Sequence, residues 1–437
     1  MGINSDGTTL IDQGLFENIG AITWDTTVKT SGFTAVSGNG YFCNTTSAAF
    51  TVTLPSSPSA GDVVAIADYA NTFDTNNITI ARNGSNIQGS AADFKAQIEG
   101  LSITLIYVDG TQGWLSIDAA QASDISGPQF TIATGGTETI SGDYKIHTFT
   151  GPGTFCVSAV GNSPIFPTGG PSNVDYLVVA GGGGGKGHAP GTSSSYAGGG
   201  GGAGGYRESS GAASGCYSRS PLGACVSALP ISATGYPITV GAGAAADNLA
   251  PSPGGGPGTA ASGSNSIFSS ITSAGGGGGA NTTAGPGGSG GGTMNANPTG
   301  QGNTPPTSPP QGNPGGTMGA FPSRGSSGGG GATVAGTNNP SGNDGSPGGA
   351  GATTSISASP TAYAGGGGGG GWNGSAKGNG GAGGGGNGGR SSNGVAGSTN
   401  TGGGGGGSGP INVVGGGGVN LGGAGGSGIV IIRYKFQ

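Results

Sequence analysis

The chain has 437 residues, of which 110 are glycine, 26 are proline and only 7% are charged. Glycine makes up about 7% of an average protein, so this composition excludes the charged surface of an ordinary soluble enzyme. A net charge of −6 without any Lys/Arg cluster excludes nucleic-acid binding as the main function. No apolar run reaches the roughly 20 residues of a transmembrane helix, so we expect no membrane insertion.

Glycine and charge are distributed unevenly along the chain. Residues 1–180 hold 22 glycines and carry a net charge of −11, whereas residues 181–437 hold 88 glycines and carry a net charge of +5. The sequence therefore predicts two physically different regions with a boundary near residue 180.

The N-terminal part reads as an attachment segment followed by a β domain. Residues 1–22 are polar with one weak apolar cluster, and we interpret them as an attachment segment; disorder is the alternative. Residues 23–119 are predicted to form an antiparallel β-sandwich, because short alternating segments are separated by turn-forming clusters. The clearest predicted strands are residues 50–54, 63–67, 78–80 and 102–108.

A short polar linker, residues 120–128, precedes a glycine-rich domain that we assign to residues 129–437. Period-two alternation predicts strands in residues 144–180 and again in residues 428–436. These strands frame about ten glycine runs, among them residues 181–185, 198–205 and 378–389. Two further short strands are predicted near residues 236–240 and 266–271.

The glycine runs have two opposed interpretations. A flexible linker is the simpler one, because ordering glycine costs about 1–2 kcal/mol of backbone entropy per residue. The alternative is an array of polyglycine-II helices, which resemble polyproline II and make no internal hydrogen bonds. Their N–H and C=O groups would bond between neighbouring helices, for about 1 kcal/mol each. The similar lengths of the runs and the framing strands favour this lattice, and we predict an all-β fold that contains it.

Three segments carry a resemblance to a known family. Residues 141–155, 174–184 and 425–434 resemble the opening and closing motifs of a glycine-rich domain found in tailed-phage fibre and virion proteins. Residues 40–62 and 107–114 resemble a module of marine and cyanobacterial phage structural proteins. This resemblance implies a fibre or adhesin on a virion, in which stacked glycine helices hold loops that contact the host surface.

The resemblance also implies partners. We expect a homotrimer that joins other virion proteins through its N-terminal region. The receptor would be a host surface polysaccharide or an outer-membrane protein. The alternatives are a purely structural appendage, such as a capsid decoration or fibre shaft, and a surface-polysaccharide hydrolase.

Bulky residues on a background of glycine are the candidates for receptor binding, because aromatic and Arg side chains dominate binding hot spots. The residues we single out are Tyr217, Arg219, Leu222, Trp372, Tyr363 and Phe321. For each of them, covering the lattice from water is an equally good interpretation. Cys216 and Cys225 close a short loop and could form a disulfide in an oxidising medium; free thiols are the alternative.

No motif predicts catalysis, a metal or a cofactor. Residues 180–187 resemble a phosphate-binding loop, but Ala180 stands where its first glycine should be and Gly187 where its Ser/Thr should be. His147 lies in a predicted strand and is interpreted as structural. We therefore expect no enzymatic activity, no catalytic residues, no metal site and no cofactor.

Overall fold

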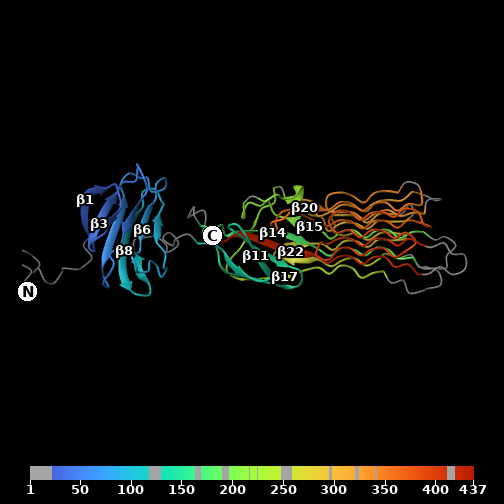
Figure 1. Cartoon of the computed structure of the whole chain (residues 1–437), viewed down its shortest axis with the longest axis horizontal. Helices are drawn as coiled ribbons and strands as arrows, with labels where there is room; N and C mark the ends of the chain where they lie inside the picture. The colour runs from blue at the N-terminus through green and yellow to red at the C-terminus, as the bar shows by residue number, and fades with distance from the viewer. Residues whose placement is uncertain are drawn as a thin grey trace, which may run out of the picture. The chain divides into compact units, whose positions relative to one another are not determined.

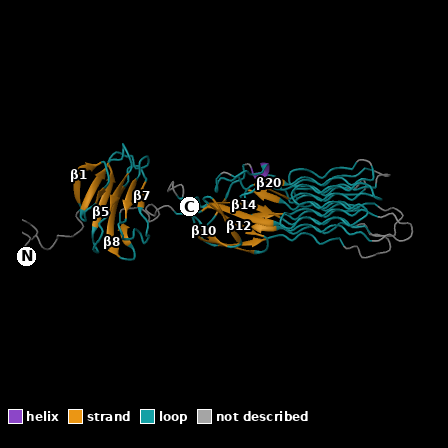
Figure 2. Ribbon diagram, in the orientation of Figure 1, coloured by secondary structure: helices purple, strands orange, loops and turns teal. Residues whose placement is uncertain are grey.

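The computed structural model describes residues 22–117, 129–162, 169–188, 196–215, 217–223, 225–247, 258–294, 298–319, 324–339, 342–410 and 419–437. The predicted attachment segment and linker lie almost entirely outside these residues. The chain divides into two compact units, with the boundary near residue 130. Both units are built of strands and loops, which confirms the all-β class (Figure 2).

The first unit is a sandwich of two sheets that enclose one apolar core. One sheet has the order β1-β3-β5-β8-β9 and the other β2-β4-β6-β7. The core holds Trp114, Phe73 and Leu54, all fully buried. The strands are β1 (Thr23–Lys29), β2 (Phe33–Thr34), β3 (Asn39–Cys43), β4 (Phe50–Thr53), β5 (Val63–Asp68), β6 (Ile78–Ala81), β7 (Phe94–Ala96), β8 (Ser102–Asp109) and β9 (Gly113–Ser116).

The pairing in this sandwich corrects the predicted antiparallel arrangement. Strands β1, β3 and β5 run parallel to one another, and so do β2, β4 and β6. Parallel neighbours need a crossover connection, and here each crossover is a strand of the opposite sheet. The chain thus coils through three turns before β7, β8 and β9 close the sheets with antiparallel pairs.

The second unit begins with a sandwich of two antiparallel sheets, ordered β10-β13-β17-β18-β19 and β11-β12-β22-β14-β15. Strand β16 pairs with β14, and β20 with β21. The elements are β10 (Ile132–Thr134), β11 (Thr137–Ser141), β12 (Tyr144–Phe149), β13 (Gly153–Ala159), β14 (Asn173–Val179), β15 (Tyr206–Glu208), the 3-10 helix η2 (Pro221–Gly223), β16 (Leu229–Pro230), β17 (Gly235–Thr239), β18 (Ser266–Phe268), β19 (Ile271–Ser273), β20 (Ala352–Thr354), β21 (Thr361–Tyr363) and β22 (Ile429–Lys435).

Most of these strands continue directly into glycine runs. Strand β14 leads into residues 181–188, and residues 196–205 lead back into β15. The final run, residues 419–428, leads into β22, which pairs with β14. Figure 1 shows the runs extending side by side from the sheets. The sheets therefore set the spacing from which these glycine runs start.

Residues 181–186 show how the runs are held together. Successive N–H groups donate to three neighbouring runs in turn, and the order repeats every three residues. The N···O distances are 2.9–3.0 Å. The carbonyls of these residues accept from three more runs, residues 240–247, 274–280 and 402–410. The donor pairs are Gly181 and Gly184 to residues 258–265, Gly182 and Gly185 to residues 419–428, and Gly183 and Lys186 to residues 196–205.

This repeat of three is the periodicity of a polyproline-II-like helix, and the six bonded neighbours describe a packed lattice of polyglycine-II helices. A flexible linker is inconsistent with such bonding. Close approach explains the glycine requirement: a Cβ added to Gly201 would lie 2.2 Å from the carbonyl oxygen of Gly183. No side chain fits at that distance.

One glycine run that the sequence presents as continuous forms two separate runs in the structure. Residues 378–389 reverse direction at a turn over residues 382–384, where Gly383 and Gly384 take positive φ values of 98° and 90°. The two halves then lie antiparallel, with the N–H of Gly388 donating to Gly378 at 2.9 Å. A sequence of glycines alone does not show where it turns, because all glycines permit positive φ.

Candidate functional site

We describe first the end of the lattice that adjoins the sheets, because several predicted receptor-binding residues lie there. Asp175 of β14 is fully buried and fixes the segment after β15. A carboxylate with this many donors holds the segment in a single conformation. The donors to its oxygens are Ser209 Oγ (2.7 Å), Gly211 N (3.0 Å), Ala213 N (3.1 Å), Ser214 N (2.7 Å) and Ser214 Oγ (2.6 Å).

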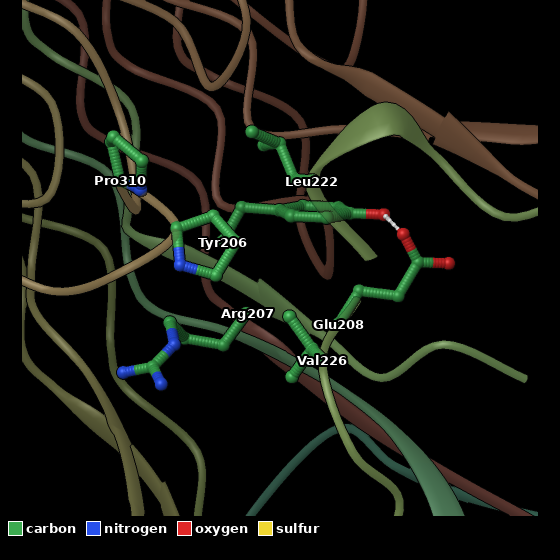
Figure 3. Close-up of a pocket in the computed structure, with 7 residues that line it drawn as sticks. Tyr206, Arg207, Glu208, Leu222, Val226 and Pro310 are labelled. Atoms are coloured by element: carbon green, nitrogen blue, oxygen red, sulfur yellow. Dashed lines mark hydrogen bonds between the residues drawn. The ribbon is translucent and has the colours of Figure 1, made fainter. Parts of the chain in front are cut away.

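A second buried carboxylate, Glu208, anchors the same segment further along. It accepts a hydrogen bond from the Tyr206 hydroxyl at 2.8 Å (Figure 3) and another from the Ser220 N–H at 3.0 Å. Burial raises the pKa of Glu208. The gap beside it leaves essentially no room for a water molecule, so it is not a ligand pocket. It is lined by Tyr206, Arg207, Glu208, Leu222, Val226, Pro309 and Pro310.

Tyr217 and Leu222 therefore belong to a packed segment. The Tyr217 ring lies 5.4 Å from the Arg433 guanidinium, and its hydroxyl donates to the Ser209 carbonyl at 3.4 Å. Burial raises the pKa of Tyr217. Leu222 packs against the core on the outer face of the β14–β22 sheet. Arg219, between them, is exposed.

Tyr363 corrects the prediction more directly. It ends β21 and is only 4% exposed, within the same apolar cluster, so it is a core residue and has no surface for a receptor. Phe321 and Cys216 lie outside the described residues. Cys225 is exposed, and the bridge between Cys216 and Cys225 stays a prediction.

Trp372 is the one predicted residue found at the far end of the lattice. It follows the run that leaves β21, and its backbone N–H donates to the Asn343 carbonyl at 2.7 Å. The Arg324 guanidinium lies 4.7 Å from the centre of its ring. This is cation–π geometry, which orients both side chains.

Sequence reasoning missed the charged residues that surround Trp372. Arg390 is exposed and donates from Nε to the Gly374 carbonyl at 2.6 Å. Lys377 is exposed as well, and Asp344 accepts from the Ala376 N–H at 2.8 Å. The signal was available, because charges are rare beyond residue 180 and each one is conspicuous.

The lysine of the phosphate-loop-like motif has a structural explanation. Lys186 is 1% exposed and its Nζ lies 2.9 Å from Asp247 Oδ2. The same carboxylate oxygen accepts the Gly187 N–H at 2.9 Å. The motif therefore ends in a buried ion pair between two runs, as its departures from the phosphate-loop pattern suggest.

His147 is structural as predicted, and its surroundings fix its tautomer. Nδ1 lies 2.7 Å from the Gly135 carbonyl, which can only accept, so Nδ1 carries the hydrogen. Nε2 then accepts from the Tyr434 hydroxyl at 3.0 Å. Burial lowers the pKa of His147.

We expect this histidine to make the protein less stable in mild acid. Its pKa is lower folded than unfolded, so below the unfolded value of about 6.5 the unfolded chain binds more protons and stability falls, by up to about 1.4 kcal/mol per pH unit. Burial also lowers the pKa of His188, which therefore acts in the same direction. Unfolding free energies of the parent and His147→Gln between pH 5 and 8 test this. The variant should show a smaller slope, and an equal slope would contradict the assignment.

Among the described residues, no group of three or more His, Cys, Asp or Glu side chains is placed to hold a metal ion. Within the same ranges, no helix is long and apolar enough to cross a membrane.

Comparison with known proteins identifies the second unit. No curated protein matches the chain. The family model described as a glycine-rich domain matches residues 157–435, from β13 to the end of β22. This range holds both sheets' central strands and all the glycine runs, and it covers more than half of the chain. The chain therefore belongs to the glycine-rich domain family.

Proposed function

We propose that this protein is a virion fibre or adhesin protein. It attaches through its N-terminal part, and it presents the far end of the glycine lattice to a receptor on the host cell surface. The resemblance of residues 141–155, 174–184 and 425–434 to phage fibre proteins supports this assignment. Homotrimer formation, contact with other virion proteins and location on the particle surface are parts of the same proposal.

The observation that carries the proposal is the direction of the lattice. The described runs extend away from the sheets (Figure 1), and at the opposite end the described turn over residues 372–375 carries Trp372. A backbone bonded to six neighbours is a rigid support. It can hold short turns in fixed positions, which lowers the entropy cost of binding. Such a support is suited to recognition by its turns.

The test uses purified full-length protein and the cells that the particle infects. An antibody against the chain should label purified particles. The free protein should compete with particles for adsorption, and Trp372→Ala should compete at least about tenfold less well, as expected for an aromatic hot spot. Lys95→Ala, which removes an exposed cation of the first unit, is the matched control and should compete normally.

Two results would count against the proposal. Particles that the antibody does not label would exclude a virion protein. Labelled particles whose adsorption is unaffected by an excess of the protein would indicate a structural appendage without receptor binding.

A further inference from the structure

The far end of the lattice concentrates basic side chains around one indole. We call Arg324, Trp372, Lys377 and Arg390 the distal basic patch. They come from runs that are bonded to one another. The N–H of Gly371 donates to the Gly389 carbonyl at 3.0 Å, and Gly371 and Arg390 form a bridge between their runs. The four residues therefore share one small surface although 66 positions separate the first from the last.

Contacts within the lattice hold the side chains of Arg324, Trp372 and Arg390. Arg324 stacks on Trp372 at 4.7 Å, and Arg390 is tied to the Gly374 carbonyl within the turn that follows Trp372. Lys377 lies on the run antiparallel to that of Arg390, because Gly388 bonds to Gly378. The indole Nε1 of Trp372 is buried and has no acceptor among the described residues.

Few carboxylates balance the charges of Lys377 and Arg390. Of the acidic side chains described at this end, Asp247 is paired with Lys186. Asp344 caps the N–H of Ala376. Within the described ranges, neither Lys377 nor Arg390 has a carboxylate at ion-pair distance. The patch is thus a local excess of positive charge on a chain whose net charge is −6.

We propose that the distal basic patch binds an anionic polysaccharide, one that carries carboxylate groups on its sugar rings. Guanidinium groups bind carboxylates through paired hydrogen bonds. An indole ring offers an apolar face, which suits the C–H face of a sugar ring. This inference rests on the proposed function and names the class of receptor.

The experiment measures binding of the full-length protein to immobilised polygalacturonate at low and high salt, with neutral dextran as the reference polymer. We expect binding to polygalacturonate only, and a marked loss between about 0.05 M and 0.5 M NaCl because salt screens exposed charges. Arg390→Gln and Lys377→Gln should each weaken binding by about tenfold, the loss of one charge-assisted contact. Lys95→Gln, which removes an exposed cation of the first unit, is the matched control and should bind as the parent does. Thermal unfolding of every variant verifies the fold.

The outcomes separate this inference from the proposed function. Equal binding of Arg390→Gln, Lys377→Gln and parent, or equal binding to dextran, would overturn the inference. If Trp372→Ala still loses competition on cells, the proposed function stands and the receptor is of another class, such as an outer-membrane protein. Patch-dependent binding to polygalacturonate without any effect on particle adsorption would support the inference and count against the adhesin function.

Discussion

Replacing Gly201 by alanine is expected to destabilise the second unit by at least about 3 kcal/mol, the upper range for overpacking a close-packed interior. The added Cβ would lie 2.2 Å from the oxygen and 2.7 Å from the carbon of the Gly183 carbonyl. Both atoms are backbone, so no rotamer change relieves the clash and a whole run must move. Chemical unfolding of the full-length protein, followed by circular dichroism, measures the difference.

The matched control is Gly151→Ala in the turn between β12 and β13. A Cβ at Gly151 has no neighbour within 4 Å and the residue's φ is not positive. The free energy of unfolding of this variant should differ from that of the parent by less than about 0.5 kcal/mol, as at other unconstrained surface positions. If Gly201→Ala were as stable as Gly151→Ala, the result would contradict the close packing of the runs around Gly201.

Replacing Asp175 by asparagine is expected to cost about 3 kcal/mol. The asparagine amide keeps the shape of the carboxylate but turns one acceptor into a donor, which would face backbone N–H groups of residues 211–214. Leaving buried donors unpaired carries this order of penalty. The Arg433 guanidinium, 4% exposed on the adjacent strand, would also lose a nearby negative charge.

Protease sensitivity between β15 and β16 gives a second readout, because this segment depends on Asp175. Asp143→Asn provides the comparison, since Asp143 is an exposed carboxylate of the same unit. It should leave both stability and cleavage unchanged. Normal stability of Asp175→Asn would show that the segment is held by other contacts.

Strands were predictable from the sequence where alternation was long enough. The predicted strands near residues 50–54, 63–67, 102–108 and 144–149 are confirmed by β4, β5, β8 and β12. The direction of pairing was not predictable, because period-two alternation is the same in parallel and antiparallel sheets. Strands β15, β20 and β21 have three residues each and are too short for periodicity to reveal.

The candidate site was predictable only in part. A bulky residue among glycines is conspicuous, but the few bulky residues are also what the sheets need for a core. Tyr363 and Tyr217 serve that purpose, while Trp372 lies at the far end. The sequence does not tell these apart, because the runs reverse direction repeatedly and position along the chain does not reveal which end of the lattice a residue occupies.

Amide hydrogen exchange of the full-length protein tests the glycine lattice most directly. Exchange reports whether each N–H is held in a hydrogen bond. We predict strong, lasting protection in peptides from residues 181–186 and 198–205, whose N–H groups bond to neighbouring runs. Protection there should exceed that in the turn around Gly151. Complete exchange of these runs within seconds would contradict the lattice and leave a flexible glycine-rich chain between folded sheets.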